Sequence, residues 1–522
     1  MKTLKSYICG RWHEAASGFV PLVDPSTEET LAQASSDGVD FAAVLDWARE
    51  RGGPALREMT FAQRGQLLKD MSKVLRDNRD ELLDLSRRNN GTTKPDGSFD
   101  VDGASGTLAY YASLAKNLGN RWFLVEGDGV QLSKSEGFWG QHVLVARRGV
   151  AVHINAFNFP AWGFAEKAAC ALLAGMPVIT KPATATALVT ERAIELIAAA
   201  GILPEGALQL IAGATGDLLD RLGPQDVLAF TGSAITAQTL RNRPRLQVAN
   251  PRMNVEADSL NAAVLGPDVA DGSPAHGLFL RDVVREITQK AGQKCTAVRR
   301  VLVPAHRLAA IQGALAAKLG AVVTGNPAQE GVTMGPLATA QQLRDAEQGV
   351  AQLAALETVR VIQGSGRRVD GAGSPAGKGF FFAPTLLQAD DARSAGAVHE
   401  REVFGPVATL LPYDGSASDA AAIVDLGGGT LVTSVYSDDT VWVGDFLAHG
   451  GGATGRLYVG SEGSAAEAPG SGAALPQALH GGPGRAGGGE ELGGVVGLKL
   501  YLQRVAVEGS KTLVDSVVGT ES

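Results

Sequence analysis

The sequence predicts an α/β protein with two regions of parallel β-sheet and a smaller, strand-rich arm. Strand and helix patterns alternate from residue 148 onward, and a second region of the same kind begins after residue 257. Two apolar segments that are typical of strands lie outside both regions. With 522 residues, of which 45% are hydrophobic and 20% charged, the chain has room for about two to four domains of ordinary globular composition.

The first part of the chain is expected to be helical before it becomes strand-rich. Residues 60–88 space apolar side chains three and four positions apart, which predicts an amphipathic helix, and residues 104–117 have a similar pattern. Residues 121–147 then contain short alternating runs, with Gly-Asp-Gly in the middle. This segment predicts a β-hairpin. Together with a strand expected over residues 495–507, it is the predicted arm.

The alternating region predicts strands separated by helices. Strands are expected at residues 149–157, 177–182, 207–213 and 226–233, and helices at residues 160–175, 185–201 and 215–223. Such alternation is typical of a parallel sheet with right-handed crossovers, in which ligands bind at the carboxyl ends of the strands. The segments Lys-Pro-Ala-Thr-Ala-Thr, Ile-Ala-Gly-Ala-Thr-Gly and Phe-Thr-Gly-Ser fall at those ends, so we expect them around one crevice.

Composition and cysteine usage exclude several classes of protein. The net charge of −8 gives no indication of binding to nucleic acid or to an anionic membrane. The three cysteines, Cys9, Cys170 and Cys295, are too scattered for a disulfide framework or a zinc site. The N-terminal segment lacks the apolar core of a signal peptide, and no window reaches the roughly 18 apolar residues that a membrane helix needs. We therefore expect a cytoplasmic protein without a bound metal.

Cys295 lies in the polar stretch Gly-Gln-Lys-Cys-Thr-Ala-Val-Arg-Arg, residues 292–300. A structural cysteine is normally buried among apolar residues. Nearby positive charges lower the pKa of a thiol and favour the nucleophilic thiolate. The setting therefore predicts that Cys295 is a nucleophile.

Three further stretches place polar residues where chemistry is expected. Asn158 follows a predicted strand in Ile-Asn-Ala-Phe-Asn-Phe-Pro, and Glu256 ends another strand in Asn-Val-Glu-Ala-Asp. Glu402 and Phe404 lie in Glu-Arg-Glu-Val-Phe-Gly-Pro-Val. Asn158 could instead cap a helix, and Glu256 could be a surface carboxylate. The glycine-rich stretch 449–494 could be a disordered linker, but the strand pattern after it favours an ordered loop packed near the site.

The chain resembles the aldehyde dehydrogenase superfamily over nearly its whole length. The resemblance rests on Phe-Asn-Phe-Pro, Lys-Pro-Ala, Phe-Thr-Gly-Ser, Gly-Gln-Lys-Cys-Thr-Ala and Glu-Val-Phe-Gly-Pro-Val, with Glu256 and the glycine-rich tail. It implies a parallel-sheet dinucleotide-binding domain, a second α/β catalytic domain and a β arm through which relatives dimerise, so a homodimer is expected. The expected bounds are residues 1–120 and 148–257 for the NADP-binding domain, 258–475 for the catalytic domain, and 121–147 and 495–510 for the arm.

The resemblance implies oxidation of an aldehyde through a covalent intermediate on Cys295. The thiolate attacks the carbonyl to give a thiohemiacetal, whose oxyanion is held by the Asn158 amide and the backbone N–H of Cys295. Hydride transfer to the nicotinamide leaves a thioester, and Glu256 activates the water that hydrolyses it. Glu256 is also expected to help deprotonate the thiol.

The resemblance also implies which residues bind the nicotinamide cofactor. Lys181 is expected to contact the adenosine ribose region, Glu402 to hold the nicotinamide ribose, and Phe404 to pack beside it. The other residues expected to bind the cofactor, several of them at turns where the chain approaches the pyrophosphate, are Asn155, Thr184, Gly213, Phe230, Gly232 and Ser233.

The identity of residue 184 bears on which cofactor is used. Thr184 stands three positions after Lys181, where NAD-using relatives commonly carry a glutamate that binds the adenine ribose 2′-hydroxyl. A carboxylate there would repel a 2′-phosphate, whereas threonine leaves room and donates a hydrogen bond, with Lys181 as the counter-charge. We therefore expect NADP.

Two other departures indicate a distinct branch of the superfamily. Ala156 precedes Phe-Asn-Phe-Pro in place of the common tryptophan, and Val-Glu-Ala-Asp-Ser-Leu-Asn surrounds Glu256. The branch resembles the dehydrogenase half of the bacterial ring-opening enzyme of phenylacetate catabolism. The resemblance implies a CoA-linked substrate, 3,4-dehydroadipyl-CoA semialdehyde from aerobic benzoyl-CoA degradation, although the sequence contains no CoA-recognition motif that we can identify.

Two alternative functions stay open at this point. A CoA-acylating aldehyde dehydrogenase would resolve the thioester with CoA, but such enzymes do not need the water-activating base that Glu256 resembles. A cysteine hydrolase or acyltransferase would pair Cys295 with His399 or His480. Reduction of NADP on addition of an aldehyde identifies a dehydrogenase, since a hydrolase reduces no cofactor.

Overall fold

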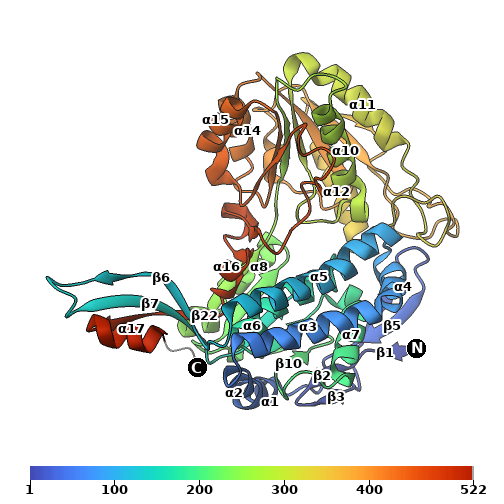
Figure 1. Ribbon diagram of the computed structural model, residues 1–522. Helices are drawn as coiled ribbons and strands as arrows, with labels where there is room; N and C mark the ends of the chain where they lie inside the picture. The colour runs from blue at the N-terminus through green and yellow to red at the C-terminus, as the bar shows by residue number, and fades with distance from the viewer. Residues whose placement is uncertain (520–522) are drawn as a thin grey trace.

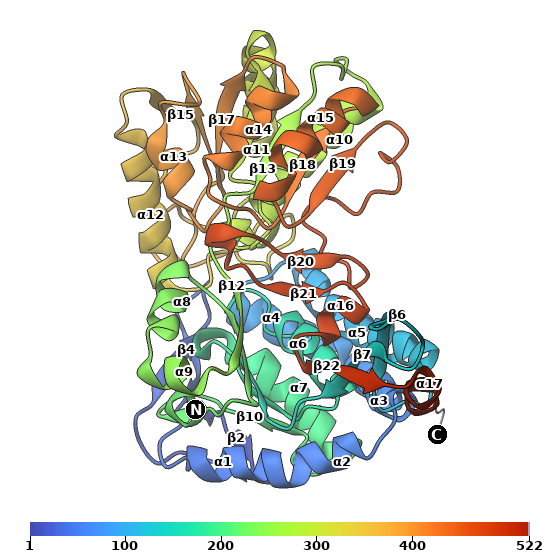
Figure 2. The same cartoon turned by 90° about the vertical axis from the view of Figure 1, so that its left-hand side faces the viewer.

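The computed structural model describes residues 1–519 as two α/β lobes with an arm that projects from the first of them (Figure 1). The chain passes from the first lobe to the second between β12 (Arg252–Glu256) and β13 (Ala262–Leu265). Near its end it returns, so that the hairpin of β20 (Leu479–Gly481) and β21 (Glu490–Leu492) lies between the lobes (Figure 2). The residue bounds that the sequence analysis gives for the two domains and the arm remain a prediction.

The sheet of the first lobe has seven strands in the order β12-β11-β8-β9-β10-β2-β3. The other strands of this sheet are β11 (Val227–Thr231), β8 (Ala151–Ile154), β9 (Val178–Lys181), β10 (Leu208–Leu210), β2 (Ser6–Ile8) and β3 (Arg11–His13). The strands from β12 to β10 run parallel, and β2 and β3 extend one edge in antiparallel pairing. The parallel sheet that the alternating pattern predicts is therefore confirmed.

Helices connect these strands largely as expected. α6 (Trp162–Ala174) and α7 (Ala187–Ala199) fill two of the predicted positions, while residues 215–223 form only the 3-10 turn η3 (Leu218–Arg221). α8 (Ala234–Arg241) and α9 (Pro244–Ala249) follow β11. α6 is buried along almost its whole length, because its apolar side chains pack with those of α3 (Phe61–Asp77) and α5 (Lys94–Leu118). This burial fixes the position of the loop that precedes α6.

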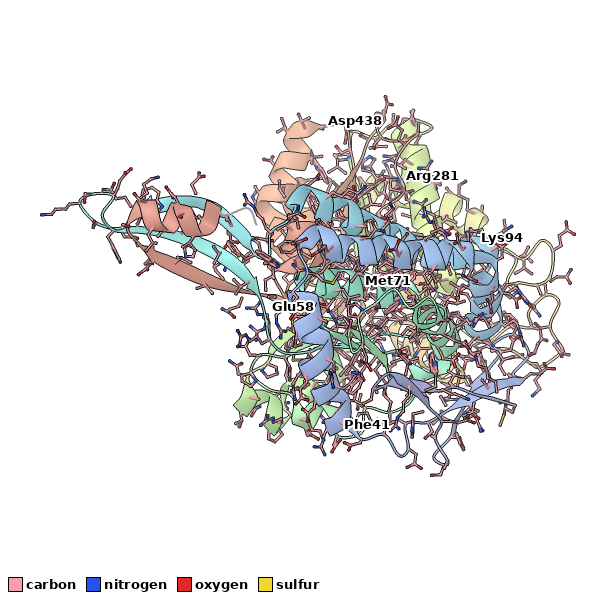
Figure 3. All side chains as sticks on the ribbon, turned by 60° about the horizontal axis from the view of Figure 1, so that its bottom comes forward. Phe41, Glu58, Met71, Lys94, Arg281 and Asp438 are labelled. Atoms are coloured by element: carbon pink, nitrogen blue, oxygen red, sulfur yellow. The ribbon has the colours of Figure 1, made fainter. Side chains whose placement is uncertain are left out.

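The N-terminal helices form a layer on the first lobe, in which Figure 3 labels Met71 on α3 and Lys94 at the start of α5. The single helix predicted over residues 60–88 is interrupted at Asn78, which leaves the helical conformation, so that α4 (Arg79–Asn90) follows α3 as a separate helix. A capping box at Thr60 begins α3. Before Thr60 the chain forms three shorter helical elements: α1 (Phe41–Trp47), the π-helical turn η1 (Ala48–Gly52) and α2 (Gly53–Arg57).

The second lobe contains a seven-stranded sheet in the order β15-β16-β17-β14-β13-β18-β19. The bounds are β15 (Val359–Gln363), β16 (Thr385–Ala389), β17 (Val407–Tyr413), β14 (Arg300–Pro304), β18 (Thr433–Tyr436) and β19 (Leu457–Gly460). Its helices are α10 (Pro274–Thr288), α11 (Leu308–Gly320), α12 (Ala340–Ala354), α13 (Gly396–Glu400), α14 (Ala417–Asp425) and α15 (Thr440–Gly450). All strands except the edge strand β15 are parallel, which confirms the second α/β region.

The arm consists of β6 (Leu124–Gln131), β7 (Trp139–Ala146) and β22 (Leu502–Gly509), in the antiparallel order β22-β7-β6, with α17 (Lys511–Gly519) against β7. The hairpin that the sequence predicts over residues 121–147 is present, but Gly-Asp-Gly does not form its turn. It lies inside β6, where Gly127 takes a positive φ and the pairing with β7 shifts between Glu126 and Val130. Residues 495–498, expected to be strand, form the short helix α16 (Val495–Leu498).

The glycine-rich stretch is ordered, as the strand pattern after it favours. Its glycines allow the chain to run close to other backbone: a Cβ on Gly487 would lie 2.2 Å from the carbonyl oxygen of Val255 in β12. A smaller sheet, β1 (Lys2–Thr3), β5 (Thr30–Ala34) and β4 (Val20–Val23), completes the first lobe. Among residues 1–519, we find no helix with the length and apolar character needed to cross a membrane.

Candidate functional site

The carboxyl ends of four parallel strands meet at one edge of the first sheet. Ile154 of β8 pairs with Lys181 of β9 and with Phe230 of β11, and Thr231 pairs with Glu256 at the end of β12. Because the strands are parallel, the loops that follow them leave the sheet on the same side. The strand ends that the sequence places together therefore lie at one edge of the sheet.

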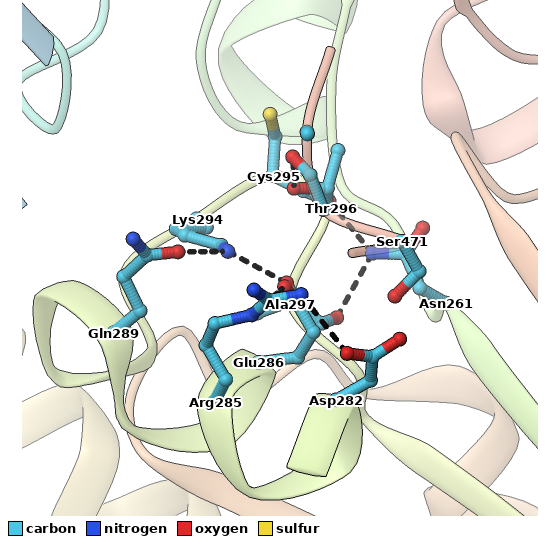
Figure 4. A network of polar contacts seen from close by, with 12 residues as sticks. Asn261, Asp282, Arg285, Glu286, Gln289, Lys294, Cys295, Thr296, Ala297 and Ser471 are labelled. Carbon is cyan, nitrogen blue, oxygen red and sulfur yellow. Dashed lines mark hydrogen bonds and ion pairs between the residues drawn. The ribbon is translucent and has the colours of Figure 1, made fainter. Parts of the chain in front are cut away.

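Cys295 lies at this edge, in the loop after the 3-10 turn η4 (Gln289–Gly292). Lys290, Ala291 and Gly292 all have positive φ, and a Cβ on Gly292 would lie 2.2 Å from the carbonyl oxygen of Gly405. Positive φ is costly for residues other than glycine and is often found at functional sites. The Asn261 side-chain amide then donates to the carbonyl oxygens of Cys295 (2.7 Å) and Ala297 (2.9 Å), which fixes the loop (Figure 4).

The cationic side chains next to Cys295 in sequence are paired with groups other than its thiol. Lys294 is buried and pairs with Glu286 at 2.6 Å, on the opposite side of the backbone from the sulfur (Figure 4). Arg299 pairs with Glu402, and Arg300 donates mainly to backbone carbonyl oxygens. Burial and the Glu256 carboxylate raise the pKa of the thiol well above its usual value. Lys294 lowers this pKa, as the cationic flank predicts, but burial and the Glu256 carboxylate outweigh it.

The thiol lies between two cavities. The larger, of about 400 Å³, lies between α5 and residues 472–477, and its lining includes Phe99, Asp102, Tyr110, Phe159, Trp162 and Cys295. A much smaller pocket on the side of the strand ends is lined by Asn155, Asn158, Glu166, Lys167, Thr231, Glu256 and Cys295. A ligand in the first cavity and a second ligand at the strand ends could therefore both reach the sulfur.

Glu256 and His480 form a buried pair beside the thiol. His480 Nε2 lies 3.4 Å from Glu256 Oε2 and 3.8 Å from Cys295 Sγ. Although burial opposes ionisation of Glu256, the pair and Lys167 hold its pKa at about 2, while the carboxylates of Glu256 and Glu166 raise the pKa of His480 against burial. His480 was considered from the sequence only as the partner of a hydrolase, since 185 residues separate it from Cys295. His399, the other candidate, is instead hydrogen-bonded to Arg300 and Ala392.

A second buried cluster lies behind Glu256, and sequence reasoning missed it. Lys167 Nζ donates to Glu166 Oε1 (2.6 Å) and to Glu491 Oε2 (3.0 Å). Carboxylate oxygens of Glu166, Glu256 and Glu491 lie within 4.8 Å of one another. Burial raises the pKa of Glu166 to about 8, so this carboxyl can bind or release a proton near neutral pH. Two adjacent charged residues in the otherwise apolar α6 were the signal that could have revealed the cluster.

Asn158 occupies the loop between β8 and α6, as expected. Its side-chain amide is buried and donates to the carbonyl oxygen of Gln293 at 3.0 Å, two residues before Cys295. Asn90 donates in turn to the carbonyl oxygen of Asn158. Since an amide nitrogen carries two hydrogens, one remains to interact with a group bound at the thiol.

Two of the polar side chains at the strand ends offer unsatisfied atoms to a ligand. Within the described residues, neither Asn155 Oδ1 nor Thr231 Oγ1 has a hydrogen-bond partner, although both atoms are buried. Lys181 and Thr184 follow at the end of β9, where both remain partly exposed. Buried polar groups are normally paired. These residues therefore fit a polar ligand that lies across the strand ends.

Other expected cofactor residues have clear structural roles. A Cβ on Gly213 would lie 2.4 Å from the backbone nitrogen of Ser36, and one on Gly232 would lie 2.5 Å from the ring of Phe230, so tight packing explains both glycines. Ser233 caps the N-terminus of α8 by accepting from the backbone N–H of Thr236.

Glu402 and Phe404 lie together across the crevice. Glu402 accepts from the backbone N–H of Ser259 (2.9 Å) and from the guanidinium of Arg299 (3.1 Å). Burial raises the pKa of Glu402 to about 7 despite this cation. The ring of Phe404 contacts that of Phe157 and lies 5.3 Å from the Arg299 guanidinium.

Comparison with known proteins gives concordant results. The model of the family described as "Aldehyde dehydrogenase family" matches residues 12–503. The chain is 45% identical over 480 residues to a 3,4-dehydroadipyl-CoA semialdehyde dehydrogenase of Aromatoleum evansii, covering 92% of this chain and 93% of the relative. It is 39% identical to Protein MaoC of Klebsiella aerogenes over 184 residues, which cover 35% of this chain and 52% of that protein. The structure superposes on a betaine aldehyde dehydrogenase of Staphylococcus aureus, solved with NAD+, with a TM-score of 0.84 at 23% identity, covering 97% of each chain.

Proposed function

This chain belongs to the aldehyde dehydrogenase family, whose members oxidise aldehydes to acids, and we propose that its own reaction is the NADP-dependent oxidation of 3,4-dehydroadipyl-CoA semialdehyde. The observation that carries the proposal is the placement of Cys295 between the cavity and the strand ends, with Glu256 and Asn158 beside it. The choice of substrate is supported by the relative from Aromatoleum evansii, which is named for that semialdehyde.

In the proposed mechanism the Cys295 thiolate attacks the aldehyde carbonyl and forms a thiohemiacetal. The free hydrogen of the Asn158 amide and the backbone N–H of Cys295 stabilise the oxyanion, because they are fixed donors in a buried site. Bound NADP would supply the hydride acceptor, and the product on the enzyme is a thioester at Cys295.

Hydrolysis of the thioester needs a base that can reach water next to Cys295. Glu256 is the proposed base, since its carboxylate lines the same small pocket as the sulfur. The proton that it takes can pass to the buried carboxylates of Glu166 and Glu491, which Lys167 holds nearby. The same base argues against the acylating alternative, in which CoA rather than water resolves the thioester.

We propose that NADP binds across the strand ends of residues 1–120 and 148–257, and that residues 258–475 supply Cys295. The unsatisfied atoms of Asn155 and Thr231 support a polar ligand there. Lys181, Thr184 and Ser233 are proposed to contact the adenosine and phosphate groups, while Gly213, Phe230 and Gly232 shape the surface on which they lie. Glu402 and Phe404 are proposed to hold the nicotinamide ribose.

The test is reduction of NADP or NAD by a panel of free and CoA-linked semialdehydes, followed by the absorbance of the reduced cofactor. We expect the highest kcat/KM for the CoA-linked substrate with NADP. Cys295→Ala should abolish turnover and leave NADP binding intact, whereas Cys9→Ala, a matched control at another partly exposed thiol, should not change either. Acid formation without cofactor reduction would support the hydrolase alternative.

A further inference from the structure

His480 is carried into the site by the β20–β21 hairpin. His480 on β20 is paired with Glu491 on β21, so the same hairpin supplies both side chains. The imidazole is 1% exposed and packs against the Trp162 ring, with 5.9 Å between the ring centres. Its position is therefore fixed from two sides.

A single nitrogen of His480 faces both reactive groups. Nε2 lies 3.4 Å from Glu256 Oε2 and 3.8 Å from Cys295 Sγ, while Nδ1 has no hydrogen-bond partner among residues 1–519. Nε2 can donate its one hydrogen to either group, and the two distances are similar. The side chain is thus placed to exchange one partner for the other without moving far.

Three other cations near the thiol pair with carboxylates, and a fourth, Arg456, donates to the backbone carbonyl oxygens of Ser471 and Ala473. Lys294 pairs with Glu286 at 2.6 Å and Arg299 with Glu402 at 3.1 Å. Lys167 is held between Glu166 and Glu491. A thiolate formed at Cys295 is largely enclosed, at the meeting of two cavities, and needs a counter-charge, because an unpaired charge away from water is unfavourable.

We propose that His480 is the counter-ion of the attacking thiolate and exchanges partners during thiol activation. The S–H bond of Cys295 breaks and its proton moves to the Glu256 carboxylate. The imidazolium keeps its proton and redirects its Nε2–H from the neutralised carboxyl to the sulfur. When the sulfur becomes acylated, the Nε2–H returns to the Glu256 carboxylate, which has by then lost its proton to the carboxylates behind it.

The surrounding charges on balance favour the protonated form of the imidazole, since they raise its pKa. Glu256 on β12 and Glu166 on α6 raise the pKa of His480, whereas burial and Arg456 lower it. Glu491, on the paired strand, faces Lys167. The imidazolium is present below the raised pKa and is lost as the pH rises through it. The imidazolium therefore stabilises the thiolate only at pH values below the pKa of His480.

The proposal predicts opposite effects on two steps. The imidazolium favours thiolate formation, but it also contributes to the low pKa of Glu256, which makes that carboxylate a weaker base toward water. Replacing His480 by an uncharged ring should slow the reactions of the thiol. It should leave thioester hydrolysis unchanged or faster. A residue that only filled space would slow both steps together.

The first test measures alkylation of Cys295 by iodoacetamide between pH 5 and 10, with neither cofactor nor aldehyde present. In His480→Phe the alkylation rate at pH 7 should fall about tenfold or more, because the thiolate loses its counter-charge. His449→Phe, at an exposed histidine of α15, is the matched control and should match the wild type. An unchanged alkylation rate at pH 7 in His480→Phe would overturn the proposal.

A second variant distinguishes the loss of charge from a defect in packing. His480→Gln keeps a polar side chain but cannot carry a charge, so it should show the same loss of alkylation rate at pH 7. Recovery of the wild-type rate would contradict a role for charge. Single-turnover kinetics then separate the formation of reduced cofactor from the hydrolysis of the thioester, and equal slowing of the two steps would also contradict the proposal. The mechanism rests on the proposed function, but the alkylation result does not, so the two can fail separately.

Discussion

Glu402 and Arg299 form a buried ion pair, with 3.1 Å between a carboxylate oxygen and a guanidinium nitrogen. The second carboxylate oxygen is occupied by the backbone N–H of Ser259. Burial nevertheless raises the pKa of Glu402 to about 7. The residue proposed to hold the nicotinamide ribose thus changes charge close to neutral pH.

Cofactor affinity is therefore expected to depend on pH. The ionised carboxylate accepts hydrogen bonds from ribose hydroxyls more strongly than the protonated acid. Since ionised Glu402 is lost as the pH falls through about 7, the Kd for NADP should rise between pH 8 and pH 6. Fluorescence titration of NADP over this range measures the effect. Glu402→Gln should remove the dependence, and an equally steep dependence in that variant would assign the titration to another group.

The Lys167 cluster is expected to be important for stability. Lys167→Met would leave the buried carboxylates of Glu166 and Glu491 without their cation, which costs about 3–5 kcal/mol for a buried pair. Urea unfolding should detect the loss. The control is Lys2→Met, at a partly exposed pair with Glu191, where a loss of at most about 1 kcal/mol is expected. Similar losses of unfolding free energy in both variants would show that the Lys167 charge does not stabilise the cluster.

Thr184 provides the test of cofactor choice. Thr184→Glu places a carboxylate where the 2′-phosphate of NADP is proposed to bind, and like charges at such a distance repel by about 1–4 kcal/mol. NADP affinity should fall by roughly one to three decades, while NAD binding holds or improves. The measurement is the ratio of kcat/KM for NADP over NAD. A wild-type preference for NAD, or an unmoved ratio, would count against the assignment.

The exposed edge strands of the arm predict that the protein forms at least a homodimer. Val130 and Leu132 at the end of β6 are 53% and 45% exposed, and β6 and β22 are edge strands that can pair with another chain. Sedimentation at micromolar concentration should give a dimer or larger assembly. Val130→Glu combined with Leu132→Glu should weaken it, whereas Val459→Glu, at an exposed valine of β19, should not. A wild-type monomer would contradict the prediction.

Residues next to strand ends could be placed from the sequence, because a parallel sheet fixes where such ends meet. Asn158 and Glu256 both follow or end a strand of the first sheet, and the structure brings them to Cys295. His480 could not be placed in this way. It reaches the thiol only because glycines let the tail run against β12, and no local periodicity records that contact.

Electrostatics were the least predictable feature. The sequence shows three cations near Cys295, but their charges are taken up by Glu286, by Glu402 and by backbone carbonyls from distant parts of the chain. The effect of such a charge on the thiol pKa is therefore outweighed here by burial and by Glu256, which the sequence around Cys295 does not reveal. The position of the hairpin turn was not predictable either, since the pairing of β6 with β7 accommodates Gly-Asp-Gly as an irregularity within the strand.

The most direct test of the account is the fate of the covalent intermediate in Glu256→Gln. Rapid mixing with NADP and the CoA-linked semialdehyde should give a burst of reduced cofactor of about one equivalent per active site, followed by a slow steady state. Mass spectrometry of the quenched enzyme should then find the acyl group on Cys295, because the thioester lacks the base that activates water. Loss of the burst together with the steady state, and an unmodified Cys295, would contradict Glu256 as the base for thioester hydrolysis.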